Sequence, residues 1–131
     1  MSTFELAIIT PEGKLFEGMA DYVNLPGSEG RFEVLAKHMN LVASLNPGVV
    51  EVSVNGAKSH FIVFDGIAQV DADSCSVLVE KGVSVKNINL EAAKEELSRL
   101  EYDLGVTESE LMKAQIHKEI EYRKAMLEFN L

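Results

Sequence analysis

The sequence predicts an all-β sandwich or flattened barrel over residues 1–87, followed by an antiparallel two-helix hairpin over residues 88–131. Three observations lead to this α+β, two-domain fold. Apolar residues alternate with polar ones in the first part, turn-forming residues interrupt that part at short intervals, and the apolar spacing lengthens to three and four residues after Asn87. We therefore expect the architecture to change near residue 88.

The alternating segments predict strands that bury one face of a sheet. Clear examples are residues 4–8, 50–54 and 77–79. Residues 61–64 differ because all four are apolar, which predicts a strand covered on both faces, either where two sheets pack or where the tail lies against the sandwich.

Turn-forming residues separate these segments at the close spacing of a sandwich. Asn55-Gly56 is the clearest hairpin signal, because both central positions of a type I′ turn need a positive φ. Gly27 and Gly30 bracket Ser28-Glu29, where glycine supplies the positive φ of a tight reversal. The full series is Pro11-Glu12-Gly13, Gly18, Pro26-Gly27, Pro47-Gly48, Asn55-Gly56, Asp65-Gly66 and Asp71-Ala72-Asp73.

Two helices are predicted after residue 87. Asn87 or Asn89 caps the first helix, and Gly105 ends it. Thr107 and Glu110 form a capping box for the second helix, and the short link makes the two helices antiparallel. The apolar stripes are Leu90, Ala93, Leu97, Leu100 and Leu104 in the first helix, and Met112, Ile116, Ile120 and Leu127, interrupted by Arg123, in the second.

Composition excludes several classes of function. The formal net charge is −9, with 12 basic and 21 acidic residues, so there is no cationic surplus for binding nucleic acid or an anionic membrane surface. The single cysteine, Cys75, excludes an internal disulfide. The chain has no run of 18 apolar residues and no secretory signal, so we expect a cytoplasmic setting without direct membrane insertion.

Few residues are candidates for catalysis or metal binding. They are His38, His60, His117 and Cys75, and they share no recognised spacing. Cys75 lies in an alternating strand, where a cysteine is usually a small apolar filler. We expect no enzyme activity from this chain alone, no metal and no cofactor.

One ordered series of residues carries a family resemblance. It reads Leu25-Pro26-Gly27-x-Glu29-Gly30, Val34-Leu35, His38, Leu41-Val42 and Leu45-x-Pro47-Gly48, with further likeness over residues 6–15 and 77–80. The series resembles the amino-terminal domain of the epsilon subunit of bacterial F-type ATP synthases. The likeness covers about two thirds of the chain in residue detail and the remainder only in pattern.

The resemblance implies a mechanical and regulatory role in the central stalk. The sandwich would join the gamma subunit to the ring of membrane c subunits, so that rotation driven by protons or sodium ions turns gamma inside the catalytic head and supports ATP synthesis. The helical hairpin would fold down or extend toward the alpha and beta subunits, where it would inhibit ATP hydrolysis. Such a subunit would be a peripheral protein on the cytoplasmic face of the bacterial inner membrane.

The resemblance also implies candidate contact residues. Glu29, Arg31 and His38 would face the ring or gamma, although the family often has an acidic or small residue near Arg31. The alternative for His38 is a loop histidine bonded to backbone or water. Basic residues of the second helix would meet the catalytic head, and their alternative is a solvated helix face with local ion pairs; these residues are Lys113, Lys118, Arg123 and Lys124.

Some epsilon subunits bind ATP at the start of the first helix. Their pattern is Ile or Leu, Asp, two variable residues, Arg and Ala, whereas this chain has Asn89 in place of the acid and Ala92 in place of the arginine. Without that guanidinium a phosphate loses its bidentate partner, so we predict weak or absent ATP binding.

Two alternatives remain open at this point. One is a free-standing sandwich adaptor whose helical hairpin docks a partner helix. The other is a small β-barrel enzyme with a closed polar pocket that contains His38, His60 or Cys75.

Overall fold

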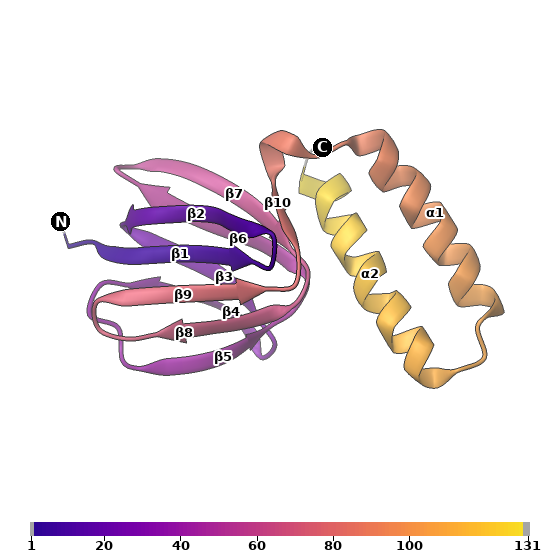
Figure 1. Ribbon diagram of the computed structural model, residues 1–131, viewed down its shortest axis with the longest axis horizontal. Coiled ribbons are helices and arrows are strands. Elements are labelled where there is room, and N and C mark those ends of the chain that lie inside the picture. The colour runs from indigo at the N-terminus through magenta and orange to yellow at the C-terminus, as the bar shows by residue number, and fades with distance from the viewer. Residues whose placement is uncertain (1, 130–131) are drawn as a thin grey trace.

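The computed structural model describes residues 2–129 and consists of a β-sandwich with a helical hairpin at one end (Figure 1). Within these residues the elements are β1 Phe4–Thr10, β2 Gly13–Ala20, β3 Tyr22–Gly27, β4 Gly30–Leu35, β5 Leu41–Leu45, β6 Gly48–Val54, β7 Ala57–Val63, β8 Gly66–Val70, β9 Ser74–Val79, β10 Gly82–Ser84, a 3-10 turn Val85–Asn87, α1 Leu90–Val106 and α2 Glu110–Phe129. The predicted fold class is confirmed.

The strands form one continuous sheet that folds over itself. Its order is β10-β7-β6-β3-β5-β8-β9-β1-β2, with β4 paired to β3 outside this path. The β1–β9 pair is parallel, and the other pairs are antiparallel. Near the two ends of the path, the rings of Phe16 on β2 and Phe61 on β7, the strand next to β10, lie edge to face with centroids 6.2 Å apart. This contact packs the two layers together inside the flattened barrel.

The core lies between the two layers because alternate side chains of each strand point inward. In β1, Phe4, Leu6 and Ile8 are at most 2% exposed, whereas the intervening Glu5 is exposed. Valine fills most other central positions, since a β-branched side chain packs well on a pleated surface. Fully buried valines include Val23, Val34, Val50, Val52, Val63 and Val77.

The turn predictions are confirmed at one site and corrected at another. Asn55 and Gly56 have φ values of 52° and 82°, as the type I′ prediction requires. Pro26-Gly27 is not a turn, because both residues belong to β3 and the reversal comes at Ser28-Glu29. Gly27 serves close packing instead, since a Cβ there would lie 2.6 Å from the carbonyl oxygen of Gly30.

The strand predicted to be covered on both faces is confirmed. Phe61 and Val63 point into the sandwich core, whereas Ile62 and Phe64 belong to a second buried cluster. That second cluster includes Tyr122 from α2, so the opposite face of β7 is covered by the hairpin.

The first helix begins as predicted but ends later. The Asn89 side-chain oxygen accepts a hydrogen bond from the Ala92 amide at 3.0 Å, which confirms Asn89 as the N-cap. Gly105 does not end α1, because the helix continues to Val106 with Thr107 as its C-cap.

The predicted capping box of the second helix is wrong. The Thr107 hydroxyl donates to the carbonyl oxygen of Asp103 at 2.6 Å and so belongs to the end of α1. Ser109 caps α2 instead, since its hydroxyl oxygen accepts from the Met112 amide at 3.3 Å. A hydroxyl two residues further along was therefore available for the same role.

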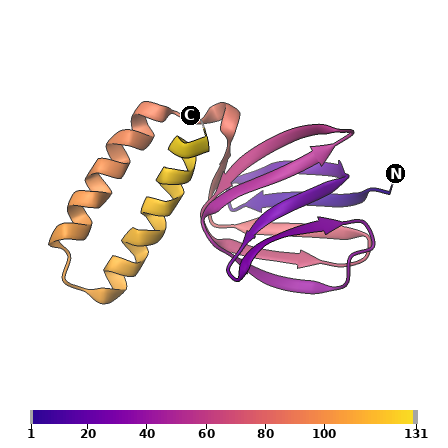
Figure 2. The same ribbon diagram turned by 180° about the vertical axis from the view of Figure 1, so that it is seen from behind.

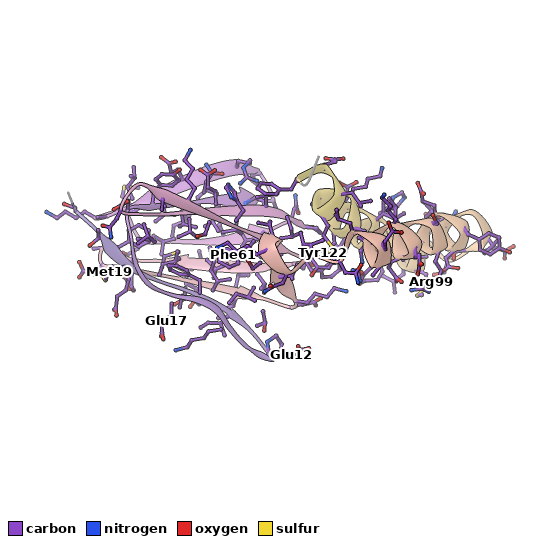
Figure 3. All side chains as sticks on the ribbon, turned by 90° about the horizontal axis from the view of Figure 1, so that it is seen from above. Glu12, Glu17, Met19, Phe61, Arg99 and Tyr122 are labelled. Atoms are coloured by element: carbon purple, nitrogen blue, oxygen red, sulfur yellow. The ribbon has the colours of Figure 1, made fainter. Side chains whose placement is uncertain are left out.

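The two helices are antiparallel, and α2 lies between α1 and the sandwich (Figures 1 and 2). Seen from above, the hairpin lies beyond one end of the sandwich (Figure 3), and α2 contacts the sandwich between Lys118 and Phe129. This arrangement explains one error in the predicted stripe. Ile120 is buried, but Met112 is 53% exposed because it lies near the far end of the hairpin, and Tyr122 and Met126 are buried in the contact with the sandwich.

Candidate protein interface

The loops at one end of the sandwich carry the first predicted contact residues. Glu29 is exposed at the tip of the β3–β4 reversal, where Gly30 has a φ of 125°. The Ser28 amide donates to the Ser44 carbonyl at 2.9 Å and ties this tip to β5. Glu29 is thus an accessible carboxylate on a braced loop.

Arg31 lies along the sheet rather than projecting from it. Its Nε donates to the Asn24 side-chain oxygen at 2.7 Å, and its Nη2 donates to the Val49 carbonyl at 2.6 Å. Partial burial lowers the pKa of Arg31, while the nearby Glu51 carboxylate opposes this shift. The guanidinium is held in one orientation by β3 and β6.

The structure brings Glu29 and Arg31 together and places His38 elsewhere. The first two residues line a hollow of about 510 Å³ between the β3–β4 reversal and β5. His38 follows the opposite end of β4 and is not among the residues that line this hollow. Its Nδ1–H donates to the adjacent Met39 carbonyl at 2.7 Å, which is the backbone bonding that the alternative interpretation anticipated.

A group of exposed apolar side chains on one sheet face was missed by the sequence predictions. On the outer side of the layer formed by β5, β8, β9, β1 and β2, Val42 is 68% and Met19 is 50% exposed. Strand register places Ile67 beside Leu78, and Leu78 beside Ile9. We call this surface the apolar sheet face; its apolar residues are Ile9, Met19, Val42, Ile67 and Leu78, and the polar residues Glu5, Gln69 and Ser76 lie among them.

A signal for this face was present in the strand patterns. In β8 and β9 the inward residues, Ala68, Val77 and Val79, are buried, so Ile67 and Leu78 occupy the alternate positions that face outward. Apolar residues in both registers of a strand indicate that both faces are covered or intended to be covered. The same criterion identified residues 61–64, and it is met less fully here, because Gln69 and Ser76 also face outward.

The four cations predicted to contact the catalytic head do not form one patch. Lys113 lies 3.6 Å from Glu110 within α2, whereas Lys118 lies 2.9 Å from Asp65 of the sandwich. Arg123 contacts the Met126 sulfur and lies over the Tyr122 ring, and Lys124 is exposed. Two of the four, Lys118 and Arg123, are engaged near the sandwich.

The histidine and cysteine candidates for catalysis are dispersed. Cys75 is 1% exposed in the sandwich core, and burial raises the pKa of its thiol to about 12. His60 lies on the outer side of β7, where its Nε2 is 2.9 Å from Glu51 Oε1. No group of three or more histidine, cysteine, aspartate or glutamate residues suited to a metal ion occurs among residues 2–129. Over the same residues, neither helix has the length and hydrophobicity needed to cross a bilayer.

Comparison with known proteins gives a consistent family match. Residues 3–85 match the family model described as ATP synthase, Delta/Epsilon chain, beta-sandwich domain. The ATP synthase epsilon chain of Bradyrhizobium sp. (strain ORS 278) is 35% identical over 105 residues, which are 80% of this chain and 78% of that protein. The epsilon chain of Nitrobacter winogradskyi is 35% identical over 115 residues, which are 87% and 85% of the two chains.

Two solved structures share the fold. A chain in the Euglena gracilis mitochondrial ATP synthase structure, described as OSCP/F1/c-ring, aligns with a TM-score of 0.85 and 19% identity over 100% of this chain and 83% of that chain. A chain from the central stalk/c-ring structure of the Tetrahymena thermophila mitochondrial ATP synthase gives a TM-score of 0.71 and 14% identity over 99% and 98% of the two chains. At these identities the similarity establishes the fold.

Proposed function

This chain belongs to the family of ATP synthase delta and epsilon chains, and we propose that it is a rotor subunit that couples ion-driven ring rotation to ATP synthesis. It would act as a non-catalytic link between the gamma subunit and the ring of c subunits. The observation that carries this proposal is the exposed apolar sheet face on a sandwich whose strands are joined by hydrogen bonds. The family membership favours this role over a free-standing adaptor or a β-barrel enzyme.

We assign the apolar sheet face to the gamma subunit. Large exposed apolar patches on soluble domains mark protein interfaces, and hydrogen-bonded strands provide a stiff base for transmitting torque. The face spans the outer side of five strands, so a partner that covers it would be held at several points rather than by one loop.

A pull-down with matched variants tests this assignment. Val42→Asp and Ile67→Asp should each reduce co-purification of the gamma subunit by more than about tenfold, because a carboxylate would be buried without a partner. Val106→Asp is the control, since Val106 is 62% exposed on the hairpin, close to the 68% of Val42. Equal recovery of gamma with Val42→Asp and Val106→Asp would contradict the assignment.

We assign Glu29, Arg31 and His38 to polar contacts with the ring or gamma. Glu29 and Arg31 share the hollow beside β5, whereas His38 stands at the other end of β4 and would reach a different part of the interface. Cysteines at these three positions should crosslink to ring or gamma subunits in membranes. Capture of neither subunit from any of the positions would contradict the assignment.

We propose that the hairpin inhibits ATP hydrolysis when it leaves the sandwich, with Lys113, Lys118, Arg123 and Lys124 contacting the alpha and beta subunits. Changing Lys113 and Lys124 to glutamine should raise ATPase activity of the assembled complex, and Lys118 is left unchanged because it also pairs with Asp65 of the sandwich. Lys94→Gln on the exposed side of α1 is the control. Unchanged activity in the double variant would contradict the inhibitory role of these residues.

We propose that the sandwich, residues 1–87, and the hairpin, residues 88–131, are separate functional units. The 3-10 turn ends at Asn87, and Ile88 is extended, with a φ of −73° and a ψ of 131°, before α1 begins. Removal of residues 88–131 should leave the chain in the complex and raise hydrolysis. We place the complex on the cytoplasmic face of the inner membrane, with this chain attached through the ring.

A further inference from the structure

The hairpin is attached to the sandwich by an apolar contact with a buried centre and a partly exposed edge. Ile62 and Phe64 from the sandwich side pack against Tyr122 and Met126 of α2, and Ala93 of α1 completes the buried part of this cluster. The remaining length of both helices extends away from the strands (Figure 3). Partly buried residues surround the buried centre, namely Val49, Val83, Val85, Ile88, Ala125 and Leu127, and polar groups add to the attachment at the edge.

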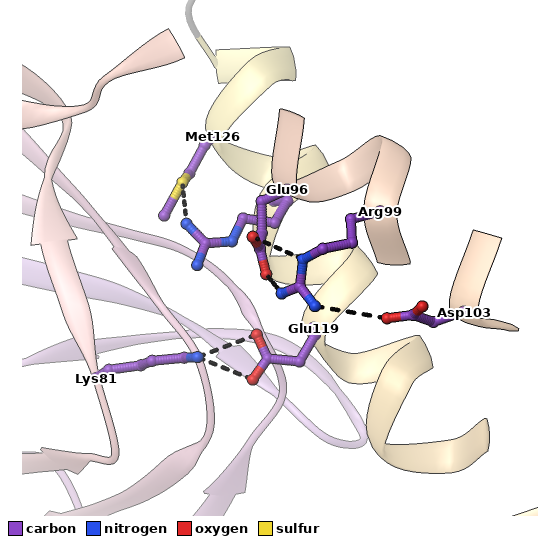
Figure 4. A network of polar contacts seen from close by, with 7 residues as sticks. Lys81, Glu96, Arg99, Asp103, Glu119 and Met126 are labelled. Atoms are coloured by element: carbon purple, nitrogen blue, oxygen red, sulfur yellow. Dashed lines mark hydrogen bonds and ion pairs between the residues drawn. The ribbon is translucent and has the colours of Figure 1, made fainter. Parts of the chain in front are cut away.

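Two ion pairs cross between the sandwich and α2 at that edge. Lys118 Nζ lies 2.9 Å from Asp65 Oδ2. Lys81 Nζ lies 2.8 Å from Glu119 Oε1 and 3.0 Å from Oε2 (Figure 4). Lys81 Nζ also lies 4.7 Å from the Phe64 ring centroid and 5.2 Å from the Tyr122 ring centroid, so its charge interacts with both the carboxylate and the aromatic pair.

Backbone hydrogen bonds join the two sandwich segments that carry these charges. The Phe64 amide donates to the Lys81 carbonyl, and the Glu80 amide donates to the Asp65 carbonyl, each at 2.9 Å. The sandwich therefore presents Asp65 to Lys118 and Lys81 to Glu119, and these two charges of α2 are adjacent in the chain. A displacement that brought Lys118 toward Lys81 would place like charges together, so this pattern favours one position of the helix.

The strength of these pairs suits a reversible attachment. The four side chains are between 22% and 47% exposed, so water screens each interaction without removing it. Pairs of this kind are individually weak, and several of them shift an equilibrium rather than fix it. The pKa of Arg99 on α1 is raised first by Glu96 and then by Asp103 and Glu119. Arg99 therefore also attracts the Glu119 carboxylate.

We propose that Asp65 and Lys81 of the sandwich and Lys118 and Glu119 of α2 form an electrostatic latch that sets the ratio of docked to undocked hairpin. Its bearing on hydrolysis rests on the proposed function, but the latch itself is a property of this chain. Docking can therefore be measured without any other subunit, and failure of the gamma pull-down would leave the latch result standing.

The test is the labelling rate of a thiol placed beneath the hairpin. Ile62 is 0% exposed under α2, so an Ile62→Cys background reacts only when the hairpin is undocked. When opening is fast and reversible, this rate is proportional to the undocked fraction. Asp65→Asn and Lys81→Met in this background should each raise the rate about two- to fivefold.

Two controls separate undocking from unfolding and from general charge effects. The native Cys75 thiol in the sandwich core should label at an unchanged rate, because it reports opening of the sandwich. Lys14→Met, which removes the exposed Lys14–Glu17 pair of β2, should leave the Ile62→Cys rate unchanged. Faster labelling of Cys75 along with Ile62→Cys would indicate unfolding and contradict the latch.

Exchange of charges makes the test specific. Asp65→Lys or Lys118→Asp alone should accelerate Ile62→Cys labelling, and the two together should restore a rate close to the starting value. With the four latch residues unchanged, raising the salt concentration from about 0.05 M to 1 M should accelerate labelling in the Ile62→Cys background. Absence of both the restoration and the salt dependence would overturn the proposal.

Discussion

The ring of Tyr122 on α2 meets the ring of Phe64 edge to face, with centroids 5.7 Å apart and an interplanar angle of 83°. Phe64 follows the end of β7 and is 1% exposed, and Tyr122 is 4% exposed. This pair joins the hairpin to the sandwich at the centre of their shared cluster. It is therefore the apolar counterpart of the ion pairs at the edge.

Loss of this aromatic contact should loosen the hairpin without unfolding the sandwich. Aromatic pairs contribute about 0.5–1.5 kcal/mol beyond the area they bury, so Tyr122→Ala should shift docking more than loss of one ion pair. Hydrogen exchange of α2 amides should accelerate while core strand amides remain protected. Tyr102→Ala, at a position 70% exposed, is the control, and equal acceleration in both variants would contradict the role of the pair.

Two glycines should respond oppositely to alanine. A Cβ at Gly66 would lie 2.1 Å from the Leu78 carbonyl oxygen, so Gly66→Ala must separate β8 from β9 and lower the free energy of unfolding. Gly105 lies inside α1 with open space where a Cβ would be added, so Gly105→Ala should stabilise that helix by about 0.5–1 kcal/mol. Urea unfolding measures both changes, and a stabilised Gly66→Ala variant would contradict the close packing.

Acidification should weaken the sandwich partly through Glu51. Its pKa is lowered chiefly by the Tyr22 hydroxyl, which donates to Oε2 at 2.6 Å, and next by His60. A carboxyl with a lowered folded-state pKa stabilises the fold above its ordinary value of 4.5, and that contribution is lost as the pH falls through the folded-state pKa.

Tyr22→Phe removes the largest cause of that shift. The pKa of Glu51 should move back toward 4.5, and the decrease in unfolding free energy on acidification should become smaller than in the unmodified chain. Urea unfolding at pH 7 and at about pH 3 measures the difference, with Tyr102→Phe as the exposed control. An identical pH dependence in all three proteins would contradict this account.

The Cys75 thiol should be unreactive in the folded chain. Burial raises its pKa to about 12, first by desolvation and further through Asp71, so very little thiolate is present near neutral pH. A thiol reagent at pH 8 should modify it only after addition of denaturant. Rapid modification under native conditions would show that the strands around Cys75 open readily.

Features that depend on neighbouring residues were predicted well. Asn55-Gly56 adopts its turn because the preference for positive φ belongs to those two residues, and Asn89 caps α1 because its side chain reaches an amide three positions ahead. The choice between two nearby residues that could fill the same role was predicted less well. Ser109 replaced Thr107 as the cap of α2, since either hydroxyl satisfies the same local rule.

The candidate interface was only partly predictable. Glu29 and Arg31 meet beside one hollow because they flank one reversal, but His38 stands beyond the other end of β4, and that separation depends on strand pairing. The apolar sheet face was missed because Val42, Ile67 and Leu78 come together only when β5, β8 and β9 align.

The sequence by itself determined the period of each segment, and through it the sandwich, the hairpin and the two-sided strand at residues 61–64. Tertiary structure alone decided which charges meet: Lys118 pairs with Asp65, 53 residues earlier in the chain, and Glu119 pairs with Lys81. Periodicity arises from local backbone geometry and is repeated along the chain, so it can be read from neighbouring residues. A single contact between distant residues depends on the position of every element between them.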